Sequence, residues 1–421
     1  MTTETIFALS SGLPPAGIAV VRISGPQAGA ALKALGGPLP VPRRASFRRF
    51  RSGDGAPLDD GLALWFPGPA TATGEDAAEL HLHGGRAVVA AVLAELARQP
   101  GCRVARAGEF TRRAFENGRI DLTEAEGLSD LLAAETEWQR RAALALAEGG
   151  LGRLVSAWEA LLLRESARIE AVLDFSDEGD VGETLPDPAP IIALADEVAR
   201  LLAAPPAERL RDGVRVVLGG PPNAGKSSLF NALIGRDAAI VTEVAGTTRD
   251  RIEAPVVLDG VPILFIDTAG LRHGVDDAVE AIGIARTEDA LQTADLVLWL
   301  GEARDAPEDS LLVAAKCDAA PGRPGLAVSV RSGTGLDALR GEIIDRARAM
   351  LPSPGTLALN ARHRDLLSEV SQHLRDAGES EDLLIRAEAL RLARGALDEI
   401  TGRAGVESML DALFGTFCIG K

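Results

Sequence analysis

Tyrosine is absent from this chain of 421 residues, and aromatic residues make up only 4% of it. Its three cysteines, Cys102, Cys317 and Cys418, lie far apart, which argues against a disulfide framework and against a zinc site. No apolar run is long enough to span a bilayer, and the first residues lack the basic and then apolar pattern of a secretion signal. We therefore expect a cytoplasmic protein.

Basic residues are also in deficit, since 44 Lys and Arg stand against 61 Asp and Glu, a net charge of −17. This balance argues against a broad nucleic-acid-binding face, so a partner would have to provide much of the basic surface for an RNA substrate. One exception is a run of five arginines, for which a solvated strand or loop face is the more typical interpretation and RNA contact the alternative. The run consists of Arg43, Arg44, Arg48, Arg49 and Arg51.

A glycine-rich loop at residues 220–227 (G-P-P-N-A-G-K-S) matches the pattern of a phosphate-binding loop. The apolar residues 214–218 before it are typical of a buried strand, and residues 228–234 after it are typical of a helix. In this arrangement backbone N–H groups and a helix N-terminus surround a phosphate. Lys226 then supplies a charge for the β- and γ-phosphates, and Ser227 supplies a hydroxyl ligand for Mg²⁺.

Three further segments follow in the order found in GTPases. Residues 264–270 end in D-T-A-G, which predicts a strand that carries Asp267 to the Mg²⁺ water shell and the Gly270 N–H to the γ-phosphate. Thr248, in the preceding G-T-T-R-D, can bind Mg²⁺ only when the γ-phosphate orders its loop. Asp318 of A-K-C-D can accept two hydrogen bonds from guanine, a pair that adenine cannot donate. The residues expected to contact GTP are Asn223, Ala224, Gly225, Lys226, Ser227, Ser228, Thr242, Thr247, Thr248, Asp267, Thr268, Ala269, Gly270, Lys316, Asp318, Ser329, Val330 and Arg331.

Two positions depart from the usual GTPase pattern. Ala315 replaces the asparagine that commonly opens the base-reading motif N-K-x-D, which should loosen the loop while Asp318 still selects the base. Leu271 follows D-T-A-G, where many GTPases place a glutamine that orients the attacking water. An apolar side chain cannot orient water, so another group has to do so.

The segments on either side of the GTPase motifs identify the kind of GTPase. The chain contains R-I-S-G at 22–25, T-G-E-D at 73–76, E-F-T-R-R-A-F at 109–115 and F-C-I-G-K at 417–421. Together with the central G-T-T-R-D motif, these segments resemble the MnmE (TrmE) family of tRNA-modification GTPases over the whole chain. The resemblance implies a GTP-hydrolysing switch that acts with the FAD protein MnmG. The pair would install aminomethyl or carboxymethylaminomethyl groups on carbon 5 of the wobble uridine.

The resemblance also implies how hydrolysis is activated. Asn223 would bind K⁺ together with Thr242, Val244 and Thr247, and this cation would neutralise charge beside the phosphates. By itself Asn223 would be an ordinary turn residue. Glu280, in V-E-A-I-G-I, would orient the water, so the catalytic residues would be Glu280, Lys226 and Thr248. Magnesium would be held by Ser227 and Thr248.

A one-carbon tetrahydrofolate derivative, the 5-formyl or the methylene form, is the implied carbon donor. Arg22, Glu79, Arg119 and Lys421 match the family's folate-binding positions, although each alone would pass for a surface charge. Arg119 stands where a lysine is common and offers a planar fork to a carboxylate. We expect the histidines, including His81 and His83, to be ordinary residues and assign Cys418 no nucleophilic role.

The expected fold is an α/β P-loop GTPase domain inserted into an all-helical domain, preceded by an α+β folate-binding domain. The expected boundaries are 1–118 for the N-terminal folate-binding and dimerisation domain, 119–210 and 351–421 for the two parts of the helical domain, and 211–350 for the GTPase domain. Residues 121–124 (D-L-T-E) predict a helix capping box. The short stretch 301–310 predicts that one crossover helix is missing.

Two alternative functions share part of this pattern. A ribosome-assembly GTPase also carries G-T-T-R-D, but it should add a second GTPase domain or a basic RNA-binding domain, and this chain shows neither. A non-catalytic GTP-binding scaffold is disfavoured by the retention of Lys226, Ser227, Thr248 and Asp267. The favoured assembly is a homodimer that forms a heterotetramer with MnmG and acts on tRNA.

Overall fold

The computed structural model describes residues 4–174, 186–235, 239–240, 253–268, 288–353, 355–404, 407–415, 417 and 419–420. The chain divides into two compact units, residues 1–129 with 398–421, and residues 130–397. Within the described ranges no helix has the length and apolar character needed to cross a membrane.

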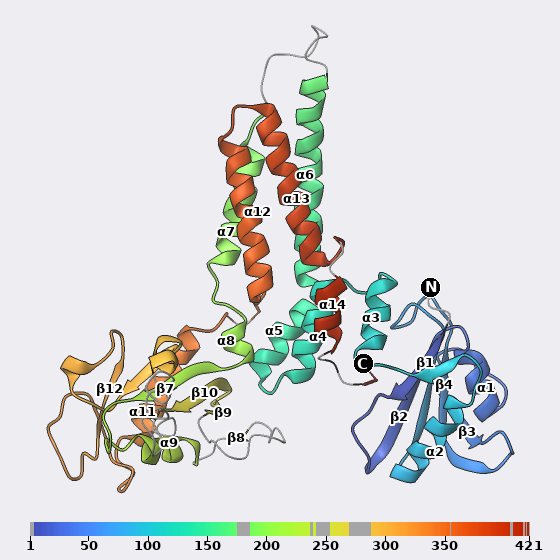
Figure 1. The fold of residues 1–421 in the computed structure, drawn as a ribbon, viewed down its shortest axis with the longest axis horizontal. Coiled ribbons are helices and arrows are strands. Elements are labelled where there is room, and N and C mark those ends of the chain that lie inside the picture. Colours follow the sequence, from blue (N-terminus) through green and yellow to red (C-terminus); the bar gives the residue numbers. More distant parts are fainter. Residues whose placement is uncertain are drawn as a thin grey trace, which may run out of the picture. The chain divides into compact units, whose positions relative to one another are not determined.

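The first unit is built on a six-stranded sheet with the order β3-β4-β5-β2-β1-β6, in which only β1 and β6 pair in parallel. Strand β2 alternates between the faces of this sheet, so Ala19, Val21 and Ile23 are buried in the core that α1 and α2 share. Arg22 therefore lies on the opposite face. The elements are β1 (Thr5–Leu9), β2 (Ala16–Ser24), α1 (Ala28–Gly36), β3 (Ser46–Arg51), β4 (Pro57–Phe66), β5 (Ala77–Gly84), α2 (Arg86–Ala97), β6 (Cys102–Val104) and α3 (Glu109–Glu116) (Figure 1).

The C-terminal segment also belongs to this unit. Helix α14 (Glu407–Gly415) contributes Phe414, which packs with Phe417 and with Leu122 at the start of α4 (Leu122–Ala133). Ile419 pairs with Ala107 in an isolated β-bridge, and Ser10 Oγ donates to the carbonyl of Gly420 at 2.8 Å. The two ends of the sequence thus meet in the first unit.

The arginine run lies on and beside the edge strand β3. Its side chains bond to neighbours within the same unit, as expected of a solvated strand face. The partners are Ala70 O for Arg43, Phe47 O and Pro38 O for Arg48, Asp60 for Arg49 and Gly55 O for Arg51.

The predicted capping box is confirmed at the start of α4. Asp121 Oδ1 accepts from the Glu124 N–H at 2.9 Å, and Glu124 Oε2 accepts from the Asp121 N–H at 2.7 Å. This reciprocal pair satisfies two N–H groups that the first turn of a helix leaves without a partner.

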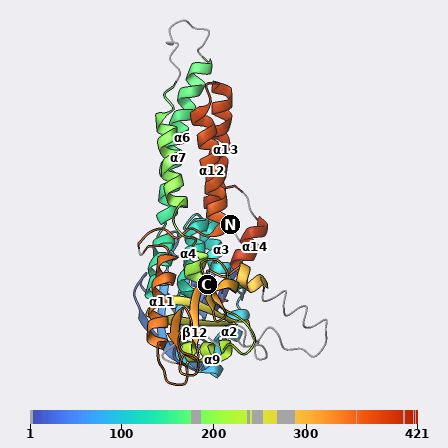
Figure 2. The same cartoon turned by 90° about the vertical axis from the view of Figure 1, so that its left-hand side faces the viewer.

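In the second unit, the long helices α6 (Gly150–Asp174), α7 (Ala189–Leu202), α12 (Ala361–Glu379) and α13 (Leu383–Thr401) run side by side (Figures 1 and 2). They bury an apolar stripe, for example Val155, Leu162 and Ile169 at seven-residue spacing on α6. The helical elements of the unit are α5 (Glu137–Ala147), α6 (Gly150–Asp174), α7 (Ala189–Leu202), α8 (Glu208–Arg211), α12 (Ala361–Glu379) and α13 (Leu383–Thr401), the last of which ends in the first unit.

A seven-stranded sheet with the order β13-β12-β11-β7-β10-β9-β8 lies between α8 and α12 in the sequence. Strands β7, β10, β11, β12 and β13 are parallel, as a P-loop domain requires, and β8 and β9 pair antiparallel at one edge. The elements are β7 (Val214–Gly219), α9 (Lys226–Ile234), β8 (Ala239–Ile240), β9 (Glu253–Leu258), β10 (Val261–Asp267), β11 (Leu296–Trp299), β12 (Leu311–Ala315), β13 (Leu326–Val328) and α11 (Leu336–Ala349).

Between β11 and β12 the chain forms only a 3₁₀ turn, Ala303–Asp305, so the predicted loss of a crossover helix is confirmed. The expected fold class is confirmed as well. An α/β P-loop domain interrupts a helical domain and follows an α+β domain in the sequence.

Candidate functional site

The phosphate-binding loop connects β7 to α9, as the sequence predicts. Gly220 has φ 134° and Gly225 has φ 106°, conformations that glycine adopts without the steric cost of a side chain. A Cβ on Gly220 would lie 3.2 Å from backbone atoms of Leu300, so the loop passes close to the end of β11. Gly225 caps the N-terminus of α9, whose free N–H groups suit a phosphate.

Lys226 is buried at the first position of α9, and its ammonium lies inside the loop. Its Nζ donates to Gly220 O at 2.9 Å and to Pro221 O at 3.0 Å. These two carbonyls hold the ammonium at the loop that is predicted to bind the phosphates. The charge of Lys226 is therefore available at the predicted phosphate site.

Two predicted oxygen donors for the Mg²⁺ site, Asp267 and Ser227, lie at the same edge of the sheet. Asp267 ends β10 and pairs in register with Leu218 of β7, directly before the phosphate loop, and Thr268 Oγ1 donates to Leu218 O at 2.7 Å. Asp267 is 5% exposed, whereas the Ser227 side chain is exposed. A carboxylate and a hydroxyl are the hard oxygen donors that Mg²⁺ prefers, so this donor set fits the ion.

The residues predicted to bind the base line one cavity of about 360 Å³. It gathers Ser228, Lys316, Asp318, Ser329, Val330 and Arg331 around Gly225, as the sequence predicts, and adds Leu229, Ala315, Ala319 and Val328. Ser329 is 1% exposed, and its hydroxyl accepts from the Ser332 N–H at 3.2 Å. The cavity is continuous with the N-terminal end of α9, so base and phosphate can be bound together.

Lys316 forms a hydrogen bond between two loops, here called the Lys316 tie, which the sequence did not predict. Its Nζ donates to the Asn223 carbonyl at 2.8 Å and joins the base loop to the phosphate loop. Ala315, which replaces the usual asparagine, cannot make a side-chain bond of this kind. Since residues 223 and 316 are far apart in sequence, no local pattern signals the contact.

Several predicted site residues lie outside the described residues. They are Thr242, Val244, Thr247, Thr248, Ala269, Gly270, Leu271, Glu280, Cys418 and Lys421. Of the predicted K⁺ ligands, the structure therefore describes only Asn223, which is exposed and has φ 62°.

A second candidate site lies on the open face of the first unit's sheet. Arg22 on β2 and Glu79 on β5 are cross-strand partners, and Arg22 Nη2 lies 3.0 Å from Glu79 Oε1. His81 Nε2 lies 3.3 Å from Glu79 Oε2, and Arg22 stands over the Phe110 ring at 5.9 Å from its centroid. His81, which the sequence analysis treats as ordinary, therefore belongs to this cluster, and its two-residue spacing from Glu79 on one strand is the signal for it.

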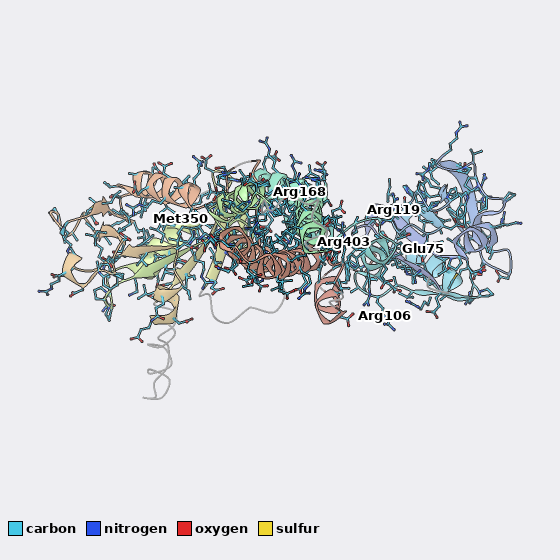
Figure 3. The ribbon with its side chains drawn as sticks, turned by 90° about the horizontal axis from the view of Figure 1, so that it is seen from above. Glu75, Arg106, Arg119, Arg168, Met350 and Arg403 are labelled. Atoms are coloured by element: carbon cyan, nitrogen blue, oxygen red, sulfur yellow. The ribbon has the colours of Figure 1, made fainter. Side chains whose placement is uncertain are left out.

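The T-G-E-D segment serves to hold this unit together. Glu75 Oε2 accepts from Ser24 Oγ at 2.8 Å and from the buried Arg113 at 3.0 Å. The exposed Arg119 lies beside the same loop, since a Cβ on Gly74 would meet its Cγ at 3.2 Å (Figure 3). Of the predicted folate residues, Arg22 and Glu79 are in contact with each other. Arg119 approaches the neighbouring T-G-E-D loop instead.

Glu109 binds two of the arginines in this region. Arg103 Nη2 lies 2.5 Å and Arg113 Nη2 3.2 Å from Glu109 Oε1. Burial alone would raise the pKa of Glu109, but the hydrogen bonds from Arg103 and from the Arg106 N–H, with the two arginine charges, lower this pKa to about 2.

We expect Glu109→Gln to destabilise the first unit by about 2 kcal/mol at neutral pH, because hydrogen bonds to charged groups contribute that much. A carboxylate whose folded pKa is lowered stabilises above its unfolded pKa, about 4.3. The difference in the free energy of unfolding between the variant and the unmodified protein should therefore shrink as the pH falls from about 4.3 toward 2. Calorimetric unfolding across this range measures it. Glu116→Gln, which loses the exposed pair with Arg112, is the matched control and should change stability less. An effect of Glu109→Gln that does not depend on pH would contradict the assignment.

Two family models match the chain. The N-terminal domain of the GTP-binding protein TrmE matches residues 5–119, and the MnmE helical domain matches residues 122–418.

Curated relatives cover the full length. A protein of Rhizorhabdus wittichii named tRNA modification GTPase MnmE is 60% identical, over 100% of this chain and 97% of its own. Proteins of the same name in Erythrobacter litoralis and Zymomonas mobilis are 56% and 49% identical, each over 99% of this chain and 100% of its own. The G domain of the T. maritima FeoB iron transporter, a solved structure, is 28% identical over 32% of this chain and 98% of its own, with a TM-score of 0.24 that is too low to bear on the fold.

Proposed function

The chain belongs to the MnmE family of tRNA modification GTPases, and from this premise we propose that it is a K⁺-activated GTP hydrolase of a tRNA-modifying complex. The observation that carries the GTPase assignment is the single cavity in which Asp318 and Ser329 meet Gly225 at the phosphate loop. It binds guanine and phosphate on one continuous surface, joined by the Lys316 tie to Asn223.

Hydrolysis requires the phosphates to be held and their charge to be neutralised. Lys226 turns its ammonium from Gly220 O and Pro221 O to the β- and γ-phosphates. Ser227, with Thr248, is proposed to hold Mg²⁺ and Asp267 to hold its water shell; the ion supplies further positive charge. Glu280, which lies outside the described residues, is proposed to orient the water in place of the apolar Leu271.

The K⁺ role is proposed for Asn223, whose amide lies on the exposed surface of the phosphate loop. Thr242, Val244 and Thr247 would complete the ligand set when their loop closes. Closure would also carry Thr248 to Mg²⁺ and form a surface on which two GTPase domains pair. This pairing would join hydrolysis to the opening and closing of a homodimer.

The carbon chemistry is proposed to use a reduced folate bound in the first unit. Arg22 and Glu79 are paired and partly exposed on the sheet face opposite α1 and α2, so both side chains are accessible to a ligand. Arg119 and Lys421 would add positive charge, with Lys421 outside the described residues. The proposed domains remain 1–118, 119–210, 211–350 and 351–421, and the proposed partners are MnmG and tRNA in the cytoplasm.

We expect Arg22→Gln to weaken binding of 5-formyl-tetrahydrofolate about ten- to a hundredfold, as loss of a charge-assisted hydrogen bond does. Titration calorimetry on the full chain measures the affinity. Arg49→Gln is the matched control, because Arg49 also pairs across strands with a carboxylate, Asp60, on the same sheet. Removal of residues 419–421 should also weaken binding. Equal affinity of Arg22→Gln and unmodified protein would remove Arg22 from the site.

Modification of tRNA tests the function as a whole. In a strain that lacks this protein, mass spectrometry should find wobble uridines without the carbon-5 group, and the unmodified gene should restore them. A gene carrying Lys226→Ala should not restore them, since the variant cannot hold the phosphates. Normal modification in the deletion strain would refute the proposal.

A further inference from the structure

A single helical turn, α8, joins the helix bundle to the first strand of the GTP-binding sheet, and different neighbours hold its residues. Leu210 is buried in the core of that sheet. Arg209 Nε donates to Asp295 Oδ1 at 2.7 Å. Glu208 Oε1 accepts from the Ala361 N–H at 2.6 Å, at the start of α12. The turn is therefore bonded both to the GTP-binding domain and to the bundle.

Asp295 fixes α8 to two strands of the GTP-binding domain. It follows the helical residues 288–292 and precedes β11, whose far end approaches the phosphate loop at Gly220. Its second oxygen accepts from the Arg215 N–H of β7 at 2.9 Å, and its side chain is 13% exposed. A displacement of β11 would therefore reach Arg209 through an ion pair whose carboxylate is largely buried.

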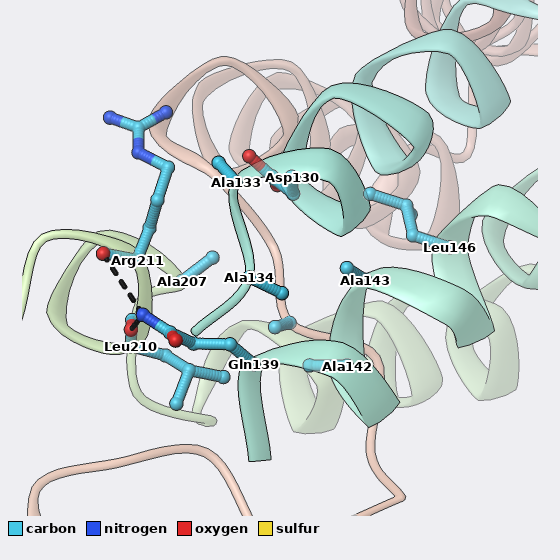
Figure 4. A pocket seen from close by; sticks show the side chains of 11 residues that line it. Asp130, Ala133, Ala134, Gln139, Ala142, Ala143, Leu146, Ala207, Leu210 and Arg211 are labelled. Carbon is cyan, nitrogen blue, oxygen red and sulfur yellow. Dashed lines mark hydrogen bonds between the residues drawn. The ribbon is translucent and has the colours of Figure 1, made fainter. Parts of the chain in front are cut away.

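On the bundle side, the amide of Gln139 holds α8. Its Nε2 donates to Leu210 O at 3.0 Å and to Arg211 O at 3.2 Å, carbonyls at the end of the turn (Figure 4). Its Oε1 accepts from the Thr136 N–H at 2.8 Å, as part of the capping box of α5. The two ends of this amide thus have separate partners, and only the nitrogen reaches α8.

Packing between α5 and α8 is incomplete around this amide. A cavity of about 40 Å³ lies there, lined by small side chains such as Ala142, Ala143 and Ala207. Figure 4 shows these alanines around the space beside Gln139. Because the alanines fill this space poorly, the bonds of the Gln139 amide add to the apolar packing of Trp138 and Ala142 in setting the position of α8 against α5.

The chain that leaves the GTP-binding domain is held at the same place. Trp138, the neighbour of Gln139, donates from Nε1 to Pro352 O at 3.0 Å. The entering and leaving segments also bond to each other, Ala207 N to Leu359 O at 2.9 Å. Two consecutive residues of α5 therefore hold both connections of the inserted domain.

We propose that Gln139 is a positioning residue that couples the GTP-binding domain to the helix bundle. A change at the nucleotide that moves β11 is transmitted through Asp295 and Arg209 to α8, and from α8 through the Gln139 amide to α5. Hydrogen-bond networks and rigid elements carry such coupling. The inference rests on the proposed function, because GTP hydrolysis supplies the change that is transmitted.

Gln139→Glu tests the proposal, because it removes the hydrogen-bond donor of the side chain and keeps the acceptor. A glutamate at this third position of the helix keeps the acceptor of the capping box, but its carboxylate cannot donate to Leu210 O and Arg211 O. We expect a lower unfolding temperature, because the buried carboxylate would face two carbonyl oxygens. Where the variant is still folded, we expect an unchanged rate of GTP hydrolysis and a loss of tRNA modification of about tenfold.

The direct measurement is the distance between nitroxide labels at residues 345 on α11 and 375 on α12, in a chain whose own cysteines are replaced. Unmodified protein should give a narrow distribution that shifts between GDP and a transition-state analogue. Gln139→Glu should broaden it and abolish the shift. Gln372→Glu makes the same chemical change at an exposed position of α12. It should alter neither the width of the distance distribution nor its shift.

Three outcomes would contradict either the proposed coupling or the proposed function. A distance distribution in Gln139→Glu identical to that of unmodified protein would overturn the proposal, as would hydrolysis that falls in parallel with modification. Should Gln139→Glu not fold, Trp138→Phe removes the bond to Pro352 O, together with part of the apolar packing of the indole, and should broaden the distribution. Absence of hydrolysis by the unmodified protein would contradict the proposed function instead. The distance distribution without nucleotide would still test whether the Gln139 amide holds α8.

Discussion

Replacing Asp318 by asparagine is expected to change the base preference from GTP to XTP, a shift on the order of 10⁴-fold in relative affinity. The Asp318 carboxylate accepts from guanine N1–H and from the 2-amino group, and xanthine carries a carbonyl in place of that amino group. An amide at residue 318 offers a donor to this carbonyl and leaves the guanine amino group without an acceptor. The effect is large because a polar group of the base would be left unpaired in the cavity.

Competition between GTP, XTP and ATP for the full-length protein measures the shift. Asp345→Asn is the matched control, because it removes an exposed carboxylate on α11 away from the cavity and should leave base choice unchanged. The tie from Lys316 to Asn223 O should keep Asp318→Asn able to bind a nucleotide at all. Equal binding of ATP and GTP by the unmodified protein would refute the assignment.

Hydrolysis in K⁺ is expected to exceed hydrolysis in Na⁺ at equal ionic strength by about a hundredfold or more, the usual cost of losing one electrostatic contact to the transition state. Asn223→Ala should remove this difference. Leu271 cannot orient water, so the chain needs another source of catalysis, and a cation at Asn223 is proposed to neutralise charge beside the phosphates. The smaller Na⁺ should fill the same ligand set poorly.

Asn231→Ala is the control, since it makes the same change at an exposed position of α9 outside the phosphate loop. Glu280→Ala should keep K⁺-dependent pairing of the GTPase domains but stop turnover, which separates cation binding from water orientation. Steady-state phosphate release measures turnover, and light scattering measures pairing of the GTPase domains. Equal rates in the two salts would rule out the cation mechanism.

The nucleotide site was largely predictable from sequence, because each of its parts is a short segment with its own local geometry. Residues 220–227 need only their flanking strand and helix to form a phosphate loop, and Asp318 follows its strand directly. The pair proposed to bind folate was suggested only by resemblance, since Arg22 and Glu79 meet across two strands that are separated in sequence. The contact between His81 and Glu79 was not predicted, although their two-residue spacing on one strand places both side chains on the same face of the sheet.

Sequence alone determined the order of the GTP-binding motifs, the capping box at residues 121–124 and the missing helix between β11 and β12. Each depends on residues close together in the chain, whose chemistry sets the local backbone. Tertiary structure alone decided that Lys316 ties the two loops of the nucleotide site and that the Gln139 amide holds α8. Both contacts join segments about 70 or more residues apart, and the packing of whole elements, rather than any local pattern, brings their polar atoms within bonding distance.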